Sequence, residues 1–273
     1  MIVQLQMSTA DLAVIIRFKN SATTLPGVIA ALKAQTVQPV RIIGVDSGCD
    51  DGSDALLSVS GATILRWSEP YHHARTLNFA LETVSEKYAL MLSSHTVLHA
   101  PDTLARMLAA MQEPSAACVS GKWSAHDDWS DAITFEELQR TGLRFCSIYS
   151  NSFGMIRRER WDEIKFDEQL ITMEDYAWAL AQVQAGHTCH RMEFPYSYQR
   201  SHKPREFAFA AITFHLAKRY GLKVGWLGWR ASAAAILSGL IASKPDTQHH
   251  IGRLRAFVRA TLSRGRFYPT CEQ

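Results

Sequence analysis

Short apolar runs rich in β-branched residues recur along the first half of the chain, and segments with helical spacing separate them. The apolar runs cover residues 12–16, 40–45, 63–65 and 88–92. The segments that place apolar residues at helical spacing cover 24–35, 77–84 and 101–111. Strands that alternate with helices in this way predict an α/β fold with an open, mainly parallel sheet.

Polar clusters follow two of the predicted strands. Residues 46–53 come directly after one strand, and residues 93–95 come after another. Ligands of open α/β sheets bind beyond the carboxyl ends of the strands. The sequence therefore predicts a binding site at this edge of the sheet.

Composition favours a soluble globular chain in a reducing compartment. The chain has 273 residues, of which 47% are hydrophobic and 20% charged, enough for one large domain with an extension. The five cysteines are scattered without a CxxC spacing, which argues against a disulfide framework or a zinc ribbon. The first residues lack the pattern of a signal peptide, so we expect a cytoplasmic protein.

Charge is unevenly distributed along the chain. Residues 203–273 contain 12 lysines and arginines against three acids, whereas the remainder has 17 against 23. We expect a main domain at 1–204 and a basic, helical extension at 205–273. The extension predicts an anionic partner, such as lipid head groups or a lipid-linked pyrophosphate, and not a nucleic acid. The alternative is a solvated helical face.

Residues 224–242 carry one charge, Arg230, and two tryptophans at one end. Three glycines and the arginine argue against a membrane span. An interfacial helix on the inner face of the plasma membrane is one interpretation. A packed helical cap or a homodimer interface is the other.

The turn at 45–53, together with residues 15–20, resembles the glycosyltransferases of family two, which have the GT-A fold. In that family an Asp, a small residue and a second Asp follow a buried strand. The resemblance covers residues 10–204 and implies that a nucleotide-sugar donor contacts five residues here, namely Arg17, Asn20, Asp46, Ser47 and Asp51. A simple Asp-Gly turn is the alternative for the two acids.

Residues 71–78 resemble a segment of one family branch that precedes a helix. The resemblance adds Arg75 and Asn78 to the donor-binding residues, and a planar guanidinium suits a diphosphate. The adjacent His72 and His73 are expected in a loop, because no third metal ligand lies near them in the sequence.

Residues 93–95 stand where the family carries its DXD motif, and both acids are missing. The pattern resembles a rhamnosyltransferase-like branch with a degenerate motif. Serine hydroxyls replace carboxylates poorly as ligands of Mg²⁺ or Mn²⁺. By resemblance, Ser94 and His95 would handle the diphosphate, and His95 with His202 would either hold a divalent cation or offset the phosphate charge directly.

Residues 174–185 predict a helix that Gly186 ends, and its first residues resemble the family's ED motif. The resemblance implies that Asp175, beside Glu174, is the general base of an inverting transfer to a hydroxyl group. Acids also favour the first turn of any helix.

These expectations combine into an inverting glycosyltransferase that acts on a glycan or a lipid-linked acceptor in bacterial cell-surface polysaccharide synthesis. A nucleotidyltransferase is disfavoured, because the sequence lacks a Gly-rich phosphate loop near the first strand. A non-catalytic sugar-nucleotide or glycan-binding protein is the main alternative, since the acids of the DXD motif are absent.

Overall fold

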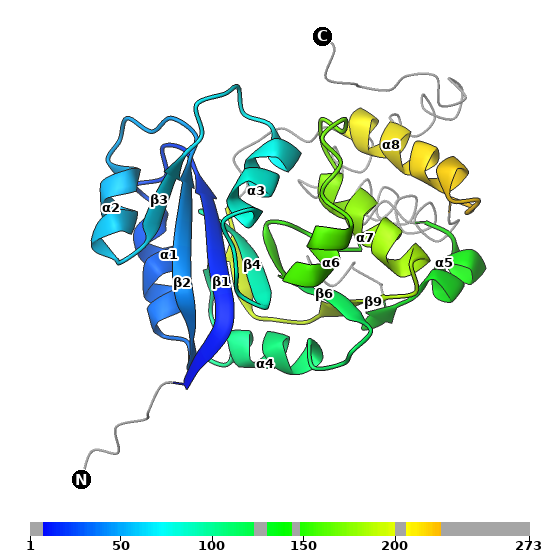
Figure 1. Ribbon diagram of the computed structural model, residues 1–273, viewed down its shortest axis with the longest axis horizontal. Coiled ribbons are helices and arrows are strands. Elements are labelled where there is room, and N and C mark those ends of the chain that lie inside the picture. Colours follow the sequence, from blue (N-terminus) through cyan, green and yellow to red (C-terminus); the bar gives the residue numbers. More distant parts are fainter. Residues whose placement is uncertain (1–7, 123–129, 144–147, 200–205, 225–273) are drawn as a thin grey trace, which may run out of the picture.

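The computed structural model, shown in Figure 1, describes residues 8–122, 130–143, 148–199 and 206–224. Its strands are β1 (Ser8–Phe18), β2 (Val37–Asp46), β3 (Thr63–Arg66), β4 (Tyr88–Ser93), β5 (Thr96–Leu98), β6 (Ala116–Gly121), β7 (Ala132–Ile133), β8 (Phe153–Arg157), β9 (Thr188–Met192) and β10 (Tyr196–Tyr198). Its helices are α1 (Leu25–Lys33), α2 (Ser53–Val59), α3 (His73–Leu81), α4 (Thr103–Ala110), α5 (Phe135–Thr141), α6 (Arg158–Glu163), α7 (Glu174–Gln184) and α8 (Glu206–Arg219).

The main sheet has the strand order β3-β2-β1-β4-β8-β6-β9-β7. The first four strands in this order are parallel, and β8 runs antiparallel to both of its neighbours. A second sheet pairs β10 with β5. The prediction of an open and mainly parallel α/β sheet is therefore confirmed.

Strand β1 divides its side chains between two cores. Ala13 and Ile15 belong to one buried cluster, together with residues of α3, α6, α7 and α8. Leu12, Val14 and Ile16 belong to a second cluster, which the apolar residues of α1, α2 and α4 complete. Successive side chains of a strand point to opposite faces, so the continuous apolar run is that of a strand covered by helices on both sides.

The predicted helices are present, with one adjustment to their bounds. Helix α1 has a proline in its first turn, as expected, and Gly186 adopts φ 92° just after α7. Helix α3 starts at His73 and ends at Leu81, so the prediction of 77–84 was displaced. Helix α2 follows the polar turn directly, with Gly52 at its N-cap and Ser53 as its first residue.

Helix α8 packs on the main domain. Its residues Ile212, Leu216 and Ala217 are buried in the same cluster as residues of α7. The Leu143 amide also donates to the Lys223 carbonyl at 2.7 Å. The described part of the predicted extension thus shares the core of residues 1–204, while 225–273 lies outside the described residues. No helix in the described part of the chain is long and apolar enough to cross a membrane.

Two glycines give opposite expectations for substitution by alanine. In Gly154→Ala the new Cβ would collide with the Tyr149 ring and lie 2.6 Å from the Ser150 carbonyl oxygen. We expect a loss of about 1–3 kcal/mol in the free energy of unfolding, the range for overpacked sites. Gly27→Ala meets only Val97 at an ordinary 3.5 Å within α1. It should be neutral or stabilise the chain by up to about 1 kcal/mol. Urea unfolding of both variants checks this, and equal stabilities would contradict the packing of β8.

Candidate active site

Parallel pairing brings four strand ends together at one edge of the sheet. Arg17 of β1 lies in register with Val45 of β2 and Ser93 of β4. Phe18 lies in register with Asp46, which in turn aligns with Arg66 of β3. The polar clusters predicted separately from the sequence therefore meet at the carboxyl edge.

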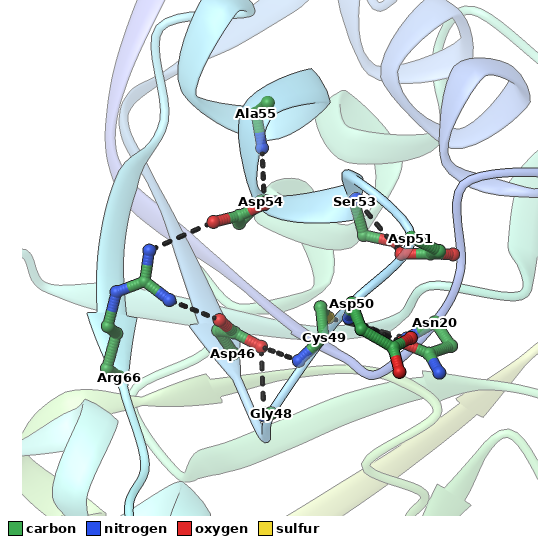
Figure 2. A network of polar contacts seen from close by, with 10 residues as sticks. All are labelled: Asn20, Asp46, Gly48, Cys49, Asp50, Asp51, Ser53, Asp54, Ala55 and Arg66. Carbon is green, nitrogen blue, oxygen red and sulfur yellow. Dashed lines mark hydrogen bonds and ion pairs between the residues drawn. The ribbon is translucent and has the colours of Figure 1, made fainter.

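Asp46 organises the turn that follows β2, as Figure 2 shows. One carboxylate oxygen accepts hydrogen bonds from the amides of Gly48 at 3.0 Å and Cys49 at 2.9 Å. The other oxygen accepts from Arg66 at 2.9 Å, and Arg66 also binds Asp54 at 2.9 Å. Asp46 is 2% exposed, so its charge is buried and compensated inside the turn.

Asp51 and Asn20 join this turn to the loop after β1. Asp51 accepts hydrogen bonds from Ser53 and, at 2.9 Å, from the Ala22 amide. The bond from the Ser53 hydroxyl, followed by the one from Ala22, lowers the pKa of Asp51. Asn20 accepts from the Asp50 amide at 3.0 Å and has φ 48°, a left-handed conformation that asparagine tolerates.

Ser21 connects this turn with the turn after β4. The Ser21 amide donates to the Ser53 hydroxyl at 2.8 Å, and the two hydroxyls of Ser21 and Ser94 lie 2.8 Å apart. His95 lies beside Ser94, with its Nδ1 3.4 Å from the Thr24 hydroxyl. The two predicted donor-binding turns therefore form one continuous hydrogen-bonded surface.

Arg17 forms a second cluster at the same edge. Its Nη1 donates to the Tyr71 hydroxyl at 2.8 Å and to Nδ1 of His73 at 3.1 Å, and its Nη2 donates to the Asn151 carbonyl at 3.2 Å. His72 caps helix α3, and His73 is its first residue. The expectation that these two histidines lie in a loop was therefore wrong for His73, whereas His72 lies just before the helix.

Asn151 holds the two acids at the start of α7. Its amide N–H donates to Asp175 at 3.1 Å, and its side chain donates to Glu174 at 3.2 Å. Asp175 also accepts from the Tyr176 amide at 2.8 Å, inside the first turn of the helix. The residue before them, Met173, has φ 63°, a strained conformation for a residue other than glycine. Strain of this kind clusters at functional sites.

Burial controls the protonation of these acids. It raises the pKa of Glu174, and it raises the pKa of Asp175 to about 7, with the negative charge of Glu174 as the second cause. The hydrogen bonds from Asn151 and Tyr176 and the charge of Arg17 act in the opposite direction on Asp175. A carboxyl group with a pKa near neutrality suits general base catalysis.

Asn78 and Arg75 lie on α3 and contact the segment around α6. The Asn78 side chain binds Phe166, Glu168 and Trp161 through four hydrogen bonds of 2.9–3.2 Å and is 4% exposed. Its amide is therefore used within the fold, which corrects the expectation of a donor contact. Arg75 is half exposed, with its Nε 3.7 Å from Glu168.

Three buried polar atoms at this edge have no hydrogen-bond partner within the described residues. They are Arg17 Nε, Ser47 Oγ and Asn151 Oδ1. Buried polar atoms are normally paired, so unpaired ones at a strand edge are consistent with a site that a ligand completes.

The described residues do not by themselves fit a divalent cation. No group of three or more histidine, cysteine or acidic side chains suited to a metal occurs in the described part of the chain. His202, the second predicted ligand beside His95, lies outside the described residues.

Solved structures share this fold. A mannosyltransferase from Pyrobaculum calidifontis in complex with GDP-Man and Mn²⁺ matches with a TM-score of 0.61 and 14% identity, over 93% of this chain and 86% of that one. S. aureus TarS 1-349 in complex with UDP-GlcNAc matches with a TM-score of 0.56 and 13% identity, over 93% and 82%. The mainly parallel sheet with helices on both faces is therefore the GT-A fold.

The sequence itself gives the family. Residues 13–165 of the 273 match the model of glycosyl transferase family 2, so the chain belongs to that family and is a glycosyltransferase. A curated relative, the O-antigen chain rhamnosyltransferase RfbN of Salmonella typhimurium, is 26% identical over 71% of this chain and 68% of its own length.

Sequence reasoning did not assign roles to several residues of the site. Asn151 contacts Arg17, Glu174 and Asp175, yet an Asn-Ser pair before a strand is a common turn sequence. Ser21, Tyr71 and His73 were also unassigned. The indication for Asn151 was that residues 151–153, which lead into the buried strand β8, also fit the family resemblance.

Glu174→Gln should lower the pKa of Asp175. Glutamine keeps an oxygen that can accept from Asn151 but removes the neighbouring negative charge, which is the second cause of the raised pKa. The carboxylate of Asp175 then forms at lower pH. Carboxyl ¹³C titration of aspartate-labelled protein measures this midpoint. Glu159→Gln, at an exposed position on α6, is the matched control. A midpoint that rises or stays at about 7 in Glu174→Gln would contradict the assigned contacts.

Proposed function

We propose that this enzyme transfers a sugar from a nucleotide-diphosphate donor to an acceptor hydroxyl in one displacement, with inversion at the anomeric carbon. The observation that carries the proposal is Asp175. It lies half-buried at the start of α7, and burial raises its pKa to about 7. The Asn151 amide donates to it, and Arg17 at the strand edge donates to the Asn151 carbonyl. A base that deprotonates the attacking hydroxyl must be close to neutrality in pKa and fixed in direction, and Asp175 meets both requirements.

The donor's nucleotide is proposed to lie along the turns after β1 and β2. Asp46, Asp51 and Asn20 fix the shape of these turns, and Ser47, whose buried hydroxyl has no hydrogen-bond partner within the described residues, is proposed to contact the base or ribose. The diphosphate is proposed to lie beside Ser94 and His95. Negative charge develops on the diphosphate as it leaves. We propose that four groups offset this charge, namely His95, Arg75, His202 and a divalent cation where one binds.

The curated relative supports a proposal for the sugar and the acceptor. RfbN is an O-antigen chain rhamnosyltransferase, and 26% identity over most of both chains supports a related chemistry. We propose deoxyhexosyl, in particular rhamnosyl, transfer to a growing glycan or lipid-linked acceptor in bacterial cell-surface polysaccharide synthesis. The detection of rhamnosyl products with such an acceptor tests this, and transfer of other sugars only would contradict it.

Asp175→Asn should abolish transfer and leave donor binding intact. Removing a general base typically costs about 10²–10⁴-fold in rate. The Asn151 amide and the Tyr176 amide donate to different carboxylate oxygens of Asp175, and asparagine keeps one of these two acceptors. We therefore expect the turn of α7 to persist with a small loss of stability. Sugar transfer and nucleotide-induced thermal shifts measure the two properties, with exposed Asp162→Asn as the control. Normal transfer by Asp175→Asn would show that Asp175 is not the base, whereas the absence of transfer by the native protein would favour a non-catalytic binding protein.

Nucleotide binding should persist, at least in part, without divalent cations, since the strand-end turn after β4 lacks carboxylates. Thermal-shift measurements with UDP, GDP, dTDP and CDP in Mn²⁺, Mg²⁺ or EDTA test this. We expect one nucleotide to raise the melting temperature in EDTA as well, because specific ligands stabilise the native state. A shift that EDTA removes completely would show that a cation is required.

The basic extension is proposed to bring the enzyme to the inner face of the plasma membrane. The charge excess of residues 203–273 supports the proposal. Because α8 contributes to the core, the whole chain is the appropriate sample. We expect flotation with anionic vesicles at low salt and not with neutral vesicles. Equal behaviour with both would contradict an electrostatic anchor.

A further inference from the structure

Arg17 is held by two separate segments of the chain. The Tyr71 hydroxyl at 2.8 Å and the His73 ring at 3.1 Å belong to the segment that leads into α3, and the Asn151 carbonyl at 3.2 Å comes from the turn before β8. An arginine only donates hydrogen bonds, so His73 accepts through Nδ1 and carries its ring proton on Nε2. The 3.1 Å contact between the Tyr71 hydroxyl and the same Nδ1 closes a triangle.

This arrangement differs from that of a diphosphate clamp. A guanidinium that binds phosphate presents two parallel N–H groups to two oxygens. Nη1 of Arg17 already uses its hydrogens on Tyr71 and His73, and Nη2 uses one on Asn151. The Nε atom is buried. Both hydrogens of Nη1 and one of Nη2 are therefore committed to the fold, and only the buried Nε–H and one N–H of Nη2 remain unused.

Arg17 interacts electrostatically with the two acids of α7. Burial opposes its charge, whereas its interactions with Tyr71, Glu174 and Asp175 raise the pKa of Arg17. Glu174 is 4% exposed, and a buried carboxylate requires a compensating partner. Arg17 supplies a positive charge, and Asn151 connects it to both acids through its carbonyl, its amide and its side chain.

We propose that Arg17 is a positioning residue for the catalytic base: it compensates the buried Glu174–Asp175 pair, and Tyr71 and His73 hold its guanidinium in place. This role replaces the donor contact expected from the sequence, and it rests on the proposed function of Asp175. It also makes the start of α3 part of the catalytic apparatus, although neither Tyr71 nor His73 touches an acid in the contacts described above.

The direction of the effect follows from the groups around Asp175. Glu174 on α7 is the adjacent acid, Tyr149 before β8 also interacts electrostatically with Asp175, and Arg17 on β1 is the cation. When Glu174 and Asp175 lose their last shared proton, both carboxylates are negatively charged side by side. Without Arg17 that doubly ionised state is less stable, so the last proton leaves at higher pH.

Carboxyl ¹³C titration of Asp175 in the whole chain tests the proposal, with the resonance assigned by its loss in Asp175→Asn. We expect a midpoint at about 7 in the native protein. Arg17→Met should raise it by about one unit, within the usual effect of a nearby charge. Arg17→Lys keeps the charge and should move it less. If Arg17→Met does not fold, Tyr71→Phe provides the test. It removes one hydrogen bond to the guanidinium without deleting the charge, and should shift the midpoint upward by a smaller amount.

Nucleotide binding provides the second readout. Arg17→Met should retain the thermal shift with whichever of UDP, GDP, dTDP or CDP stabilises the native chain. An unchanged titration midpoint of Asp175 in Arg17→Met would overturn the proposal. If that variant also loses the thermal shift with nucleotide, Arg17 belongs to the donor site. The titration requires no sugar transfer. Normal transfer by Asp175→Asn would thus refute the function of the base separately from the role of Arg17.

Discussion

The parallel pairing of β1 with β2 and β4 is the constraint on which the rest of the site depends. It sets Arg17 level with Val45 and Ser93, and Phe18 level with Asp46. A slip of one residue would turn every side chain of β1 to the other face and would move Ile15 from one core to the other. The two apolar cores thus determine where the polar strand ends meet.

The site combines buried charge with local strain, and the fold compensates both. Asp46 is neutralised by two amides of its own turn and by Arg66. Glu174 and Asp175 depend on Asn151 and Arg17, which lie on other elements. The left-handed Met173 costs about 1–3 kcal/mol, and the buried residues of α7 hold it in place. Both parts of the edge therefore depend on contacts between separate elements: Arg66 of β3 for Asp46, and Asn151 and Arg17 for the base.

The elements with strong local patterns could be predicted from the sequence, and those without could not. Residues 12–16 form a strand because their apolar, β-branched side chains are buried on both faces. Strands β6 and β9 were not predicted, because their residues have no such local pattern. They are strands through their pairing with each other and with β8 and β7. The start of α3 was missed since a histidine N-cap is unusual. The acids of the site were found by resemblance, but the partner of Arg17 lies 134 residues away in sequence, and local patterns contain no information about such contacts.

The central claim is that the carboxyl edge holds the donor, with its sugar end toward Asp175. A crystal structure of the chain with the stabilising nucleoside diphosphate tests it most directly. The account predicts a base near Asp46 and Ser47, a diphosphate beside Ser94 and His95, and a terminal phosphate directed toward Asp175. A nucleotide bound elsewhere, or one whose terminal phosphate points away from Asp175, would contradict the account.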